Sequence, residues 1–224
     1  MSPWGLLLAG VLLILERACY VWIARAPDAF RRACAHPGAW FGEPVAIVRT
    51  LFYAFKALQL SVFVGWCYVH GGGELAPTDD PRALAIGTAL MVAGQILNLS
   101  VFYRLGRVGV FYGDRLGYEV PWCWEFPFSW LSHPQYVGTV LTIWGFFAAT
   151  RFPHDDWSVL PALETIYYVS STWLEERGRR AAPVSLSPDL TGRGPGRPAA
   201  TASPPGGAGS RSSTANCGSI IDPS

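Results

Sequence analysis

Long apolar segments constrain the fold of this chain most, because each must be covered by lipid or by other protein. A helix needs about 20 mostly apolar residues to cross the roughly 30 Å hydrocarbon core of a bilayer. Segments 6–23, 45–69 and 83–103 are long apolar runs, and segments 136–150 and 157–174 are shorter ones. We therefore predict an all-α, polytopic transmembrane bundle of four to five membrane helices.

The composition agrees with membrane insertion. Hydrophobic residues make up 50% of the chain and charged residues 15%, whereas a soluble domain carries about 25% charged residues. Residues 181–224 consist mainly of Pro, Gly, Ser, Ala, Thr and Arg. This division predicts a membrane-embedded domain over residues 1–180 and a disordered Pro/Gly/Ser-rich tail over residues 181–224.

Charged and short segments leave the number of crossings open. Glu16 and Arg17 interrupt the first apolar segment, and such neighbours either pair or mark a helix that dips into the bilayer without crossing it. Segment 136–150 would be about 22 Å long as a helix. Segments 136–150 and 157–174 form either a tight helical hairpin or one membrane span, 157–174, preceded by a re-entrant segment.

The arginine pattern predicts an orientation, because short cytoplasmic loops collect positive charge. Arginines follow the first, third and last apolar segments, whereas residues 71–80 contain neither Arg nor Lys. We expect five crossings, with the N-terminus outside and the tail in the cytoplasm. No Lys or Arg precedes the first segment and no small-residue cleavage site follows it, so we expect it to be retained.

The sequence gives no support for several classes of partner and site. The formal net charge is +1 without a concentrated basic face, so we expect no nucleic-acid partner. The five cysteines form neither a CxxC pair nor a Cys/His cluster, so we expect no metal site and no disulfide framework. Phosphate-binding glycine motifs are missing, which argues against a Rossmann fold. The sequence does not indicate an oligomeric state.

Two adjacent carboxylates, Glu175 and Glu176, directly follow the last apolar segment. Neighbouring residues on a helix project about 100° apart, so the two do not form one chelating face. They either end the segment in solvated charge, balanced by the arginines that follow, or bind a cation. An anion is unfavourable at a helix C-terminus, which favours a cationic partner.

A His-Pro-Gln-Tyr motif begins at His133, where the aromatic loop 104–135 enters a helix. Pro134 suits the first helical turn and Ser132 suits the N-cap, so a helix start explains the motif without a function. A histidine can also exchange protons in catalysis, and at the mouth of the bundle His133 would contact a substrate or cofactor. We expect loop 104–135 to be ordered at the membrane interface, because it is long and rich in Trp and Tyr.

Several short motifs follow one another in the second half of the chain: Leu105-Gly106, Gly109 to Asp114, Phe126-Pro127-Phe128, His133 to Gly138, and Trp173 to Glu176. In order and spacing they resemble the phosphatidylethanolamine N-methyltransferase family, over roughly residues 84–177. The first two apolar segments resemble that family more loosely, and the tail does not resemble it.

The resemblance implies an enzyme of the endoplasmic reticulum membrane that acts on a phospholipid partner within the bilayer. It would methylate the headgroup amine of phosphatidylethanolamine, or of its mono- and dimethyl derivatives, in phosphatidylcholine biosynthesis. That family assigns the donor, S-adenosyl-L-methionine, to a Gly-x-Gly in the third span and to paired acids. These positions correspond here to Val92, Ala93 and Gly94, where Val92 replaces the first glycine, and to Glu175 and Glu176.

The implied chemistry needs a base, because the headgroup amine is protonated at pH 7 and only a neutral nitrogen attacks the methyl group. The candidates are His133, then Glu125, then the carboxylates of Glu175 and Glu176. The quaternary product is a cation that aromatic rings bind. The candidate rings are those of Trp122, Trp124, Phe128 and Tyr136.

Three other interpretations stay open. An isoprenylcysteine-type carboxyl methyltransferase shares the His-Pro-x-Tyr-x-Gly and acidic C-terminal features but needs no base. A membrane sterol reductase would use a nicotinamide cofactor. A membrane scaffold would have no catalytic activity.

Overall fold

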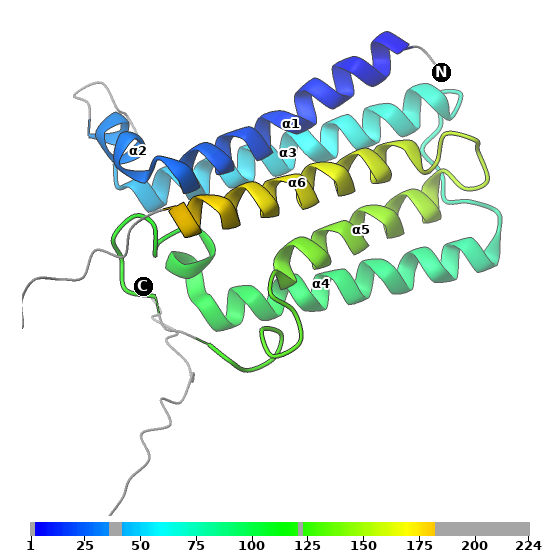
Figure 1. Ribbon diagram of the computed structural model, residues 1–224. Helices are drawn as coiled ribbons and strands as arrows, with labels where there is room; N and C mark the ends of the chain where they lie inside the picture. The colour runs from blue at the N-terminus through cyan, green and yellow to red at the C-terminus, as the bar shows by residue number, and fades with distance from the viewer. Residues whose placement is uncertain (1–2, 36–41, 121–122, 182–224) are drawn as a thin grey trace, which may run out of the picture.

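The computed structural model describes residues 3–35, 42–120 and 123–181, which form α-helices joined by turns and loops, without a strand (Figure 1). The all-α prediction is confirmed, and each predicted apolar segment corresponds to one helix. The predicted disordered tail lies outside the described residues. The helices are α1 (Pro3–Arg25), α2 (Pro27–Cys34), α3 (Pro44–His70), α4 (Pro81–Val110), α5 (Pro134–Thr150) and α6 (Val159–Ala181).

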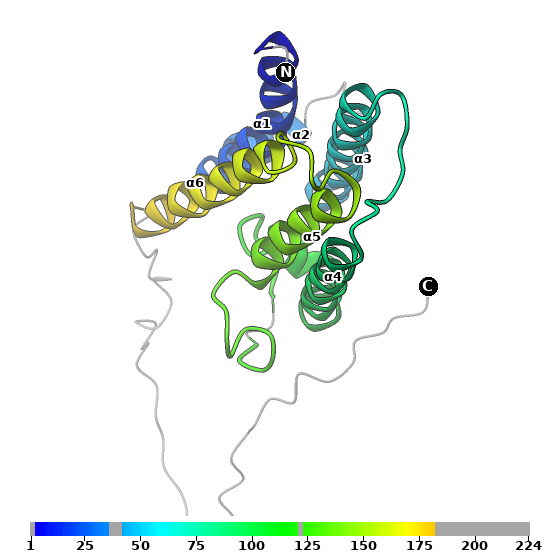
Figure 2. The ribbon, with the colours of Figure 1, turned by 90° about the vertical axis from the view of Figure 1, so that its right-hand side faces the viewer.

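Three helices, α1, α3 and α4, are long and apolar enough to cross a membrane. Helix α1 continues without a break through Glu16 and Arg17, whose side chains form an ion pair with each other. Of the two interpretations of these charges, pairing is therefore the one observed. Helix α5 has 17 residues, about 26 Å, and it lies beside α4 and α6 in both views (Figures 1 and 2).

Prolines begin five of these helices, α1 at Pro3 and four others. Pro27, Pro44, Pro81 and Pro134 lie in the first turn of α2, α3, α4 and α5, where the fixed φ suits a helix and the missing N–H removes no helical hydrogen bond. The N-cap of α5 is His133, without a side-chain capping bond, so the predicted Ser132 cap was wrong.

Facing glycines join α4 and α5 as antiparallel neighbours. Gly87 faces Gly145 and Gly94 faces Gly138, so the two contacts are seven positions apart on each helix. A Cβ on Gly87 would lie 2.6 Å from the carbonyl oxygen of Gly145, and a Cβ on Gly138 would lie 2.7 Å from that of Gly94. Such close backbone approach is typical of small residues at membrane helix interfaces.

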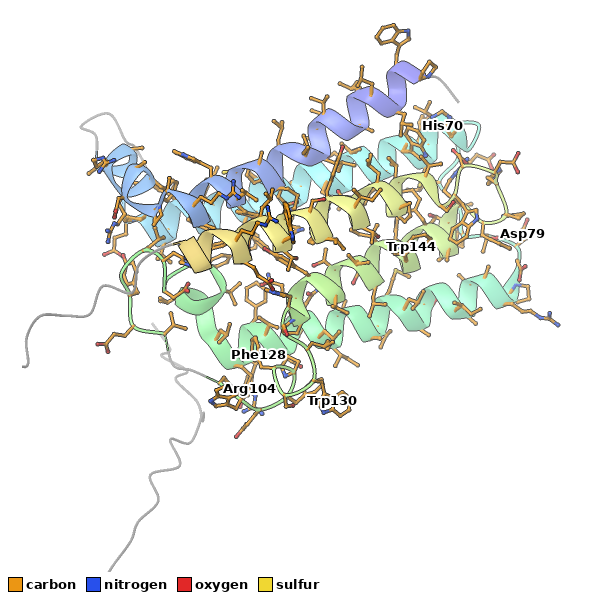
Figure 3. All side chains as sticks on the ribbon, viewed as in Figure 1. His70, Asp79, Arg104, Phe128, Trp130 and Trp144 are labelled. Carbon is orange, nitrogen blue, oxygen red and sulfur yellow. The ribbon has the colours of Figure 1, made fainter. Side chains whose placement is uncertain are left out.

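One end of the bundle, which we call the basic end, gathers the arginines that the sequence analysis singled out. The C-termini of α1, α4 and α6 meet there with the N-termini of α3 and α5 (Figure 1). His70 and Asp79 lie at the opposite end (Figure 3). The chain thus alternates between the two ends of the bundle, as the arginine pattern predicted. The cytoplasmic location of the basic end stays a prediction. Described arginines of the basic end include Arg25, Arg31, Arg32, Arg49, Arg104, Arg107, Arg115 and Arg177.

The aromatic loop begins later than predicted. Helix α4 passes Arg104 and ends at Val110, with a kink at Gly106, whose φ is 62°. The turns that follow carry Trp124 and Trp130, which are 75% and 81% exposed. Figure 3 shows Arg104 and Trp130 on the side of the bundle that carries the loop before α5, away from His70 and Asp79. Exposed indole rings at this level suit the headgroup layer of a membrane.

Replacing Gly145 by Ala tests the α4–α5 contact. A Cβ there would lie 2.5 Å from the carbonyl oxygen of Gly87, so the helices must separate, and such overpacking costs about 1–3 kcal/mol. Gly65→Ala is the matched control, because its Cβ would meet nothing within 4 Å. We expect a lower melting temperature in detergent for Gly145→Ala alone, and equal melting temperatures would contradict the contact.

Candidate active site

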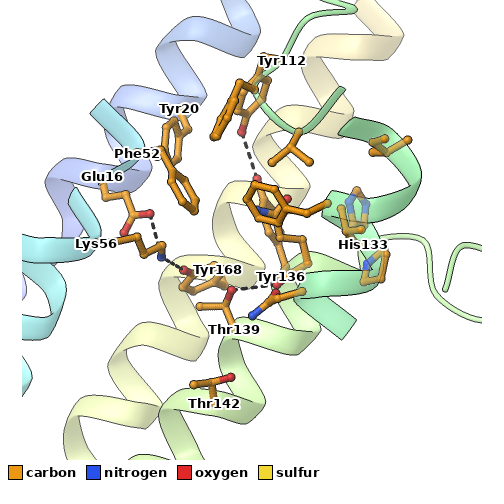
Figure 4. A pocket seen from close by; sticks show the side chains of 18 of the residues that line it. Glu16, Tyr20, Phe52, Lys56, Tyr112, His133, Tyr136, Thr139, Thr142 and Tyr168 are labelled. Carbon is orange, nitrogen blue, oxygen red and sulfur yellow. Dashed lines mark hydrogen bonds and ion pairs between the residues drawn. The ribbon is translucent and has the colours of Figure 1, made fainter. Parts of the chain in front are cut away.

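A cavity of about 560 Å³ extends from the basic end into the bundle. Its wall comes from α1, α3, α4, α5, α6 and the turn after α4. This volume lies within the range of about 300–1,000 Å³ that small-molecule sites occupy. The charged groups of the wall include a carboxylate held by tyrosines and, beside Glu16, a pair of cations from α1 and α3; Asp114 and Arg115 line the wall as well. Figure 4 shows Glu16 and Lys56 together with Tyr112 and Tyr136 of the wall.

Glu175 supplies one carboxylate of the cavity wall. Its side chain lies on α6 and the residue is only 8% exposed. The hydroxyl of Tyr136 donates to it at 2.9 Å and that of Tyr112 at 3.1 Å. The two hydroxyls lie 3.2 Å from each other. Two phenol donors thus hold one buried carboxylate at the cavity wall.

The turn after α4 directs Tyr112 into the bundle. Its φ of 58° is in the left-handed region, which is uncommon for a bulky side chain. Gly113 allows the turn: its amide donates to the carbonyl of Val108 at 2.9 Å, and a Cβ would lie 2.5 Å from that oxygen. Burial, with added contributions from Tyr136 and Glu175, raises the pKa of Tyr112 well above its usual value. The phenol therefore stays protonated and donates.

Glu176 has a different partner, as the 100° separation of adjacent helical residues requires. Its carboxylate lies 3.0 Å from Nε2 of His133, whose ring stacks on Tyr136 at a centroid distance of 5.8 Å. Both side chains are partly exposed, and His133 lines the cavity. The structure thus brings His133, Glu175 and Glu176 together at the mouth of the cavity.

The other predicted site residues lie elsewhere. Val92 is 54% exposed on the outer side of α4, and Ala93 is also exposed. Gly94 packs against α5, and none of the three lines the cavity. Glu125 lies outside the cavity as well, in an ion pair with Arg104. Their predicted roles stay predictions.

Two of the four predicted aromatic residues, Phe128 and Tyr136, line the cavity. Trp124 is exposed, and Trp122 lies outside the described residues.

The sequence analysis named Tyr136 but assigned no role to Tyr112 beside Glu175, or to Tyr20 and Tyr168 beside Arg17. The guanidinium of Arg17 lies 4.1 Å from the ring centroid of Tyr168 and 5.0 Å from that of Tyr20. Tyrosines are common in membrane helices, so neither residue is conspicuous in the sequence. The signal available was the position of charged residues inside apolar segments, which marked Arg17 and Lys56.

Comparison with known proteins identifies the family. Residues 83–178 match the phospholipid methyltransferase family. The chain is 30% identical over 138 residues to a phosphatidyl-N-methylethanolamine N-methyltransferase of Arabidopsis thaliana, covering 61% of this chain and 75% of the plant protein. It is 32% identical over 140 residues to the phosphatidylethanolamine N-methyltransferase of Homo sapiens, covering 61% and 68%.

The chain therefore belongs to the phospholipid methyltransferase family. It is a membrane protein of the methyltransferase class, and the matched segment holds Tyr112, His133, Tyr136, Glu175 and Glu176. No solved structure matches the chain significantly.

The tyrosine contacts can be tested without any ligand. Tyr136→Phe removes one hydroxyl donor, which lies 2.9 and 3.1 Å from the two carboxylate oxygens of Glu175, and a hydrogen bond to a charged group contributes about 1.5–3 kcal/mol. Tyr53→Phe is the matched control, because Tyr53 is 60% exposed on α3. We expect a lower free energy of unfolding for Tyr136→Phe only. An unchanged value would show that the hydroxyl does not support Glu175.

Proposed function

We propose that this chain transfers a methyl group from S-adenosyl-L-methionine to the amine of a membrane phospholipid. The acceptor is phosphatidylethanolamine or its mono- and dimethyl derivatives, in phosphatidylcholine biosynthesis. The observation that carries the proposal is the buried carboxylate of Glu175 in the cavity wall. Among the described residues it accepts from phenols and pairs with no cationic side chain. Such a group suits a cationic ligand, and both the sulfonium donor and the lipid ammonium are cations.

Glu175 and Glu176 are the proposed donor-binding residues. The donor supplies an electrophilic methyl group on a sulfonium ion, together with ribose hydroxyls and an ammonium group. The carboxylates accept hydrogen bonds from these groups, with Glu175 fixed by Tyr136 and Glu176 by His133. Assignment of the donor to Val92, Ala93 and Gly94 stays a prediction from the family resemblance. The contact of Gly94 with Gly138 supports an indirect role, because it sets the position of α5.

His133 is the proposed base. During transfer the amine nitrogen forms a bond to the methyl carbon, the sulfur–carbon bond breaks, and its electron pair stays on sulfur. The nitrogen must first lose a proton, and His133 lines the cavity while its Nε2 contacts Glu176 near solvent. In this arrangement His133 takes the proton from the amine and passes it by way of Glu176 to the solvent. Glu125, the second candidate, is 53% exposed and pairs with Arg104. The ring faces of Tyr136 and Phe128 suit the quaternary product.

The proposed location is the endoplasmic reticulum membrane or another internal membrane. Three apolar helices provide the membrane anchoring, and the acceptor is a lipid of the same bilayer.

Donor binding tests the role of Glu175. We expect Glu175→Gln to weaken equilibrium binding of labelled S-adenosylmethionine by about tenfold or more, because charge-assisted hydrogen bonds are lost. Glu74→Gln is the matched control, since Glu74 is exposed in the loop at the opposite end. Equal affinities of the two variants would remove Glu175 from the donor site.

The pH profile tests the role of His133. We expect His133→Gln to lower kcat/KM at pH 7 by about 100-fold, within the usual range for a lost general base. The deficit should shrink as pH rises, because a larger fraction of the free amine is then neutral without help. His154→Gln, an exposed histidine at the opposite end, should follow the wild-type profile. A deficit that is constant with pH would contradict a base role.

Product analysis separates the alternatives. Membranes given labelled S-adenosylmethionine should accumulate label in N-methylated phospholipids. Label in prenylcysteine esters, or in no product, would support a carboxyl methyltransferase or a scaffold instead.

A further inference from the structure

A second group of charges lies deeper in the cavity than Glu175. Lys56, the only lysine of the chain, is twelve residues inside α3. Arg17 is eight residues from the end of α1, about 12 Å along the helix. Charged side chains inside membrane helices are costly and mark functional sites. Neither residue has a role in the chemistry described above, and both lie outside the segment that matches the family.

The cavity wall at this depth carries more positive than negative charge. Glu16 pairs with Arg17 and also accepts from Lys56 at 3.1 Å. Lys56 donates in addition to the hydroxyl of Tyr168 at 3.1 Å (Figure 4). One carboxylate thus faces two cations. Another buried acid, Glu164, accepts a hydrogen bond from Gln59 and does not line the cavity.

Two donors at this position have no acceptor. The Nε–H of Arg17 and the hydroxyl of Tyr20 are buried without a hydrogen-bond partner among the described residues. Arg17 is 5% exposed and Tyr20 is also 5% exposed, and both line the cavity. Buried donors are rarely left unpaired, so the two groups point to an acceptor supplied by a ligand.

The side chain of Tyr136 connects the positive and negative ends of the cavity. The guanidinium of Arg17 lies 5.6 Å from the ring centroid of Tyr136, whose hydroxyl donates to Glu175. A phospholipid amine carries its ammonium and its phosphate two carbon atoms apart. Such a headgroup can therefore reach both ends of the cavity in one orientation, with its ammonium at Glu175 and its phosphate at Arg17.

The cavity also reaches the lipid-facing surface. Leu60 of α3 and Leu99 of α4 line it, yet they are 56% and 66% exposed. In a membrane these exposed side chains face acyl chains. A headgroup can enter between α3 and α4 while its acyl chains remain in the bilayer.

We propose that Arg17 and Lys56, with the hydroxyl of Tyr20, bind the phosphate of the phospholipid acceptor and orient its amine toward Glu175. This inference rests on the proposed function in one respect, the identity of the acceptor. The carboxylate of the methyl donor is a different oxyanion that the same cations would attract, and the test below separates the two.

The test measures binding and requires no turnover. Full-length protein in detergent, stripped of lipid, is titrated with labelled phosphatidyl-N-methylethanolamine, and separately with labelled S-adenosylmethionine. Lys56→Gln should weaken phospholipid binding by about tenfold or more and leave donor binding within twofold, about the error of such titrations. Lys56→Arg should retain lipid binding. Arg49→Gln, an exposed cation of the same helix, should behave like wild type. Diacylglycerol with the same acyl chains should bind weakly and equally to all variants.

Other results overturn the proposal. Weaker donor binding with unchanged lipid binding in Lys56→Gln would assign the cations to the donor carboxylate. Unchanged binding of both ligands would remove the anion site. If wild-type protein binds the phospholipid as expected but transfers no methyl group, the proposed function fails while the phosphate site stands.

Two further variants guard against misfolding. Should Lys56→Gln not fold, Glu16→Gln combined with Lys56→Gln removes both partners of one ion pair, and it should show the same loss of lipid binding. Tyr20→Phe removes a hydroxyl that has no partner among the described residues, so the melting temperature should not fall. Lipid affinity should drop about threefold or more through the lost hydrogen bond. Full affinity in either folded variant contradicts the phosphate site.

Discussion

Burial of the Glu175 carboxylate is the constraint on which the basic end depends. A carboxylate that is 8% exposed is stable only with strong hydrogen bonds, since burial of an unpaired charge is very costly. Its donors come from the turn after α4 and from α5, while Glu175 itself lies on α6. Three elements must therefore meet at one point. The facing glycines of α4 and α5 and the left-handed turn at Tyr112 are the devices that bring them together.

The cavity has two charged ends, and this polarity links the fold to its chemistry. Glu175 forms the negative end and Arg17 with Lys56 forms the positive end, with Tyr136 between them. Aromatic and aliphatic side chains make up much of the rest of the wall, together with uncharged polar side chains such as those of Gln59, Asn98 and Thr139. Charges in this apolar setting are weakly screened, so they orient a zwitterionic headgroup more strongly than they would in water.

The sequence predicted those parts of the structure that depend on local patterns. Membrane thickness sets the length of an apolar helix, so each apolar segment was found, with most ends within about three residues. Helices α4 and α6 continue seven residues beyond the predicted ends, because charged residues interrupt the apolar pattern there. The start of α5 at Pro134 followed from the rigid proline ring, whereas the Ser132 cap was wrong. Motif order indicated His133, Glu175 and Glu176. Their partners were not predictable, because Tyr112 and Glu175 are separated by 63 residues and no local pattern joins them. The correspondence of Val92, Ala93 and Gly94 with the family's Gly-x-Gly likewise did not predict which face of α4 packs against α5.

The central claim is that the methyl donor binds beside Glu175, inside the bundle. Ultraviolet cross-linking of labelled S-adenosylmethionine to the full-length protein, followed by peptide mapping, tests this claim most directly. We predict saturable label on the peptides that contain Tyr136 or Glu175, and its loss with excess unlabelled donor. Saturable label on the outer face of α4, at Val92 or Ala93, would contradict the account.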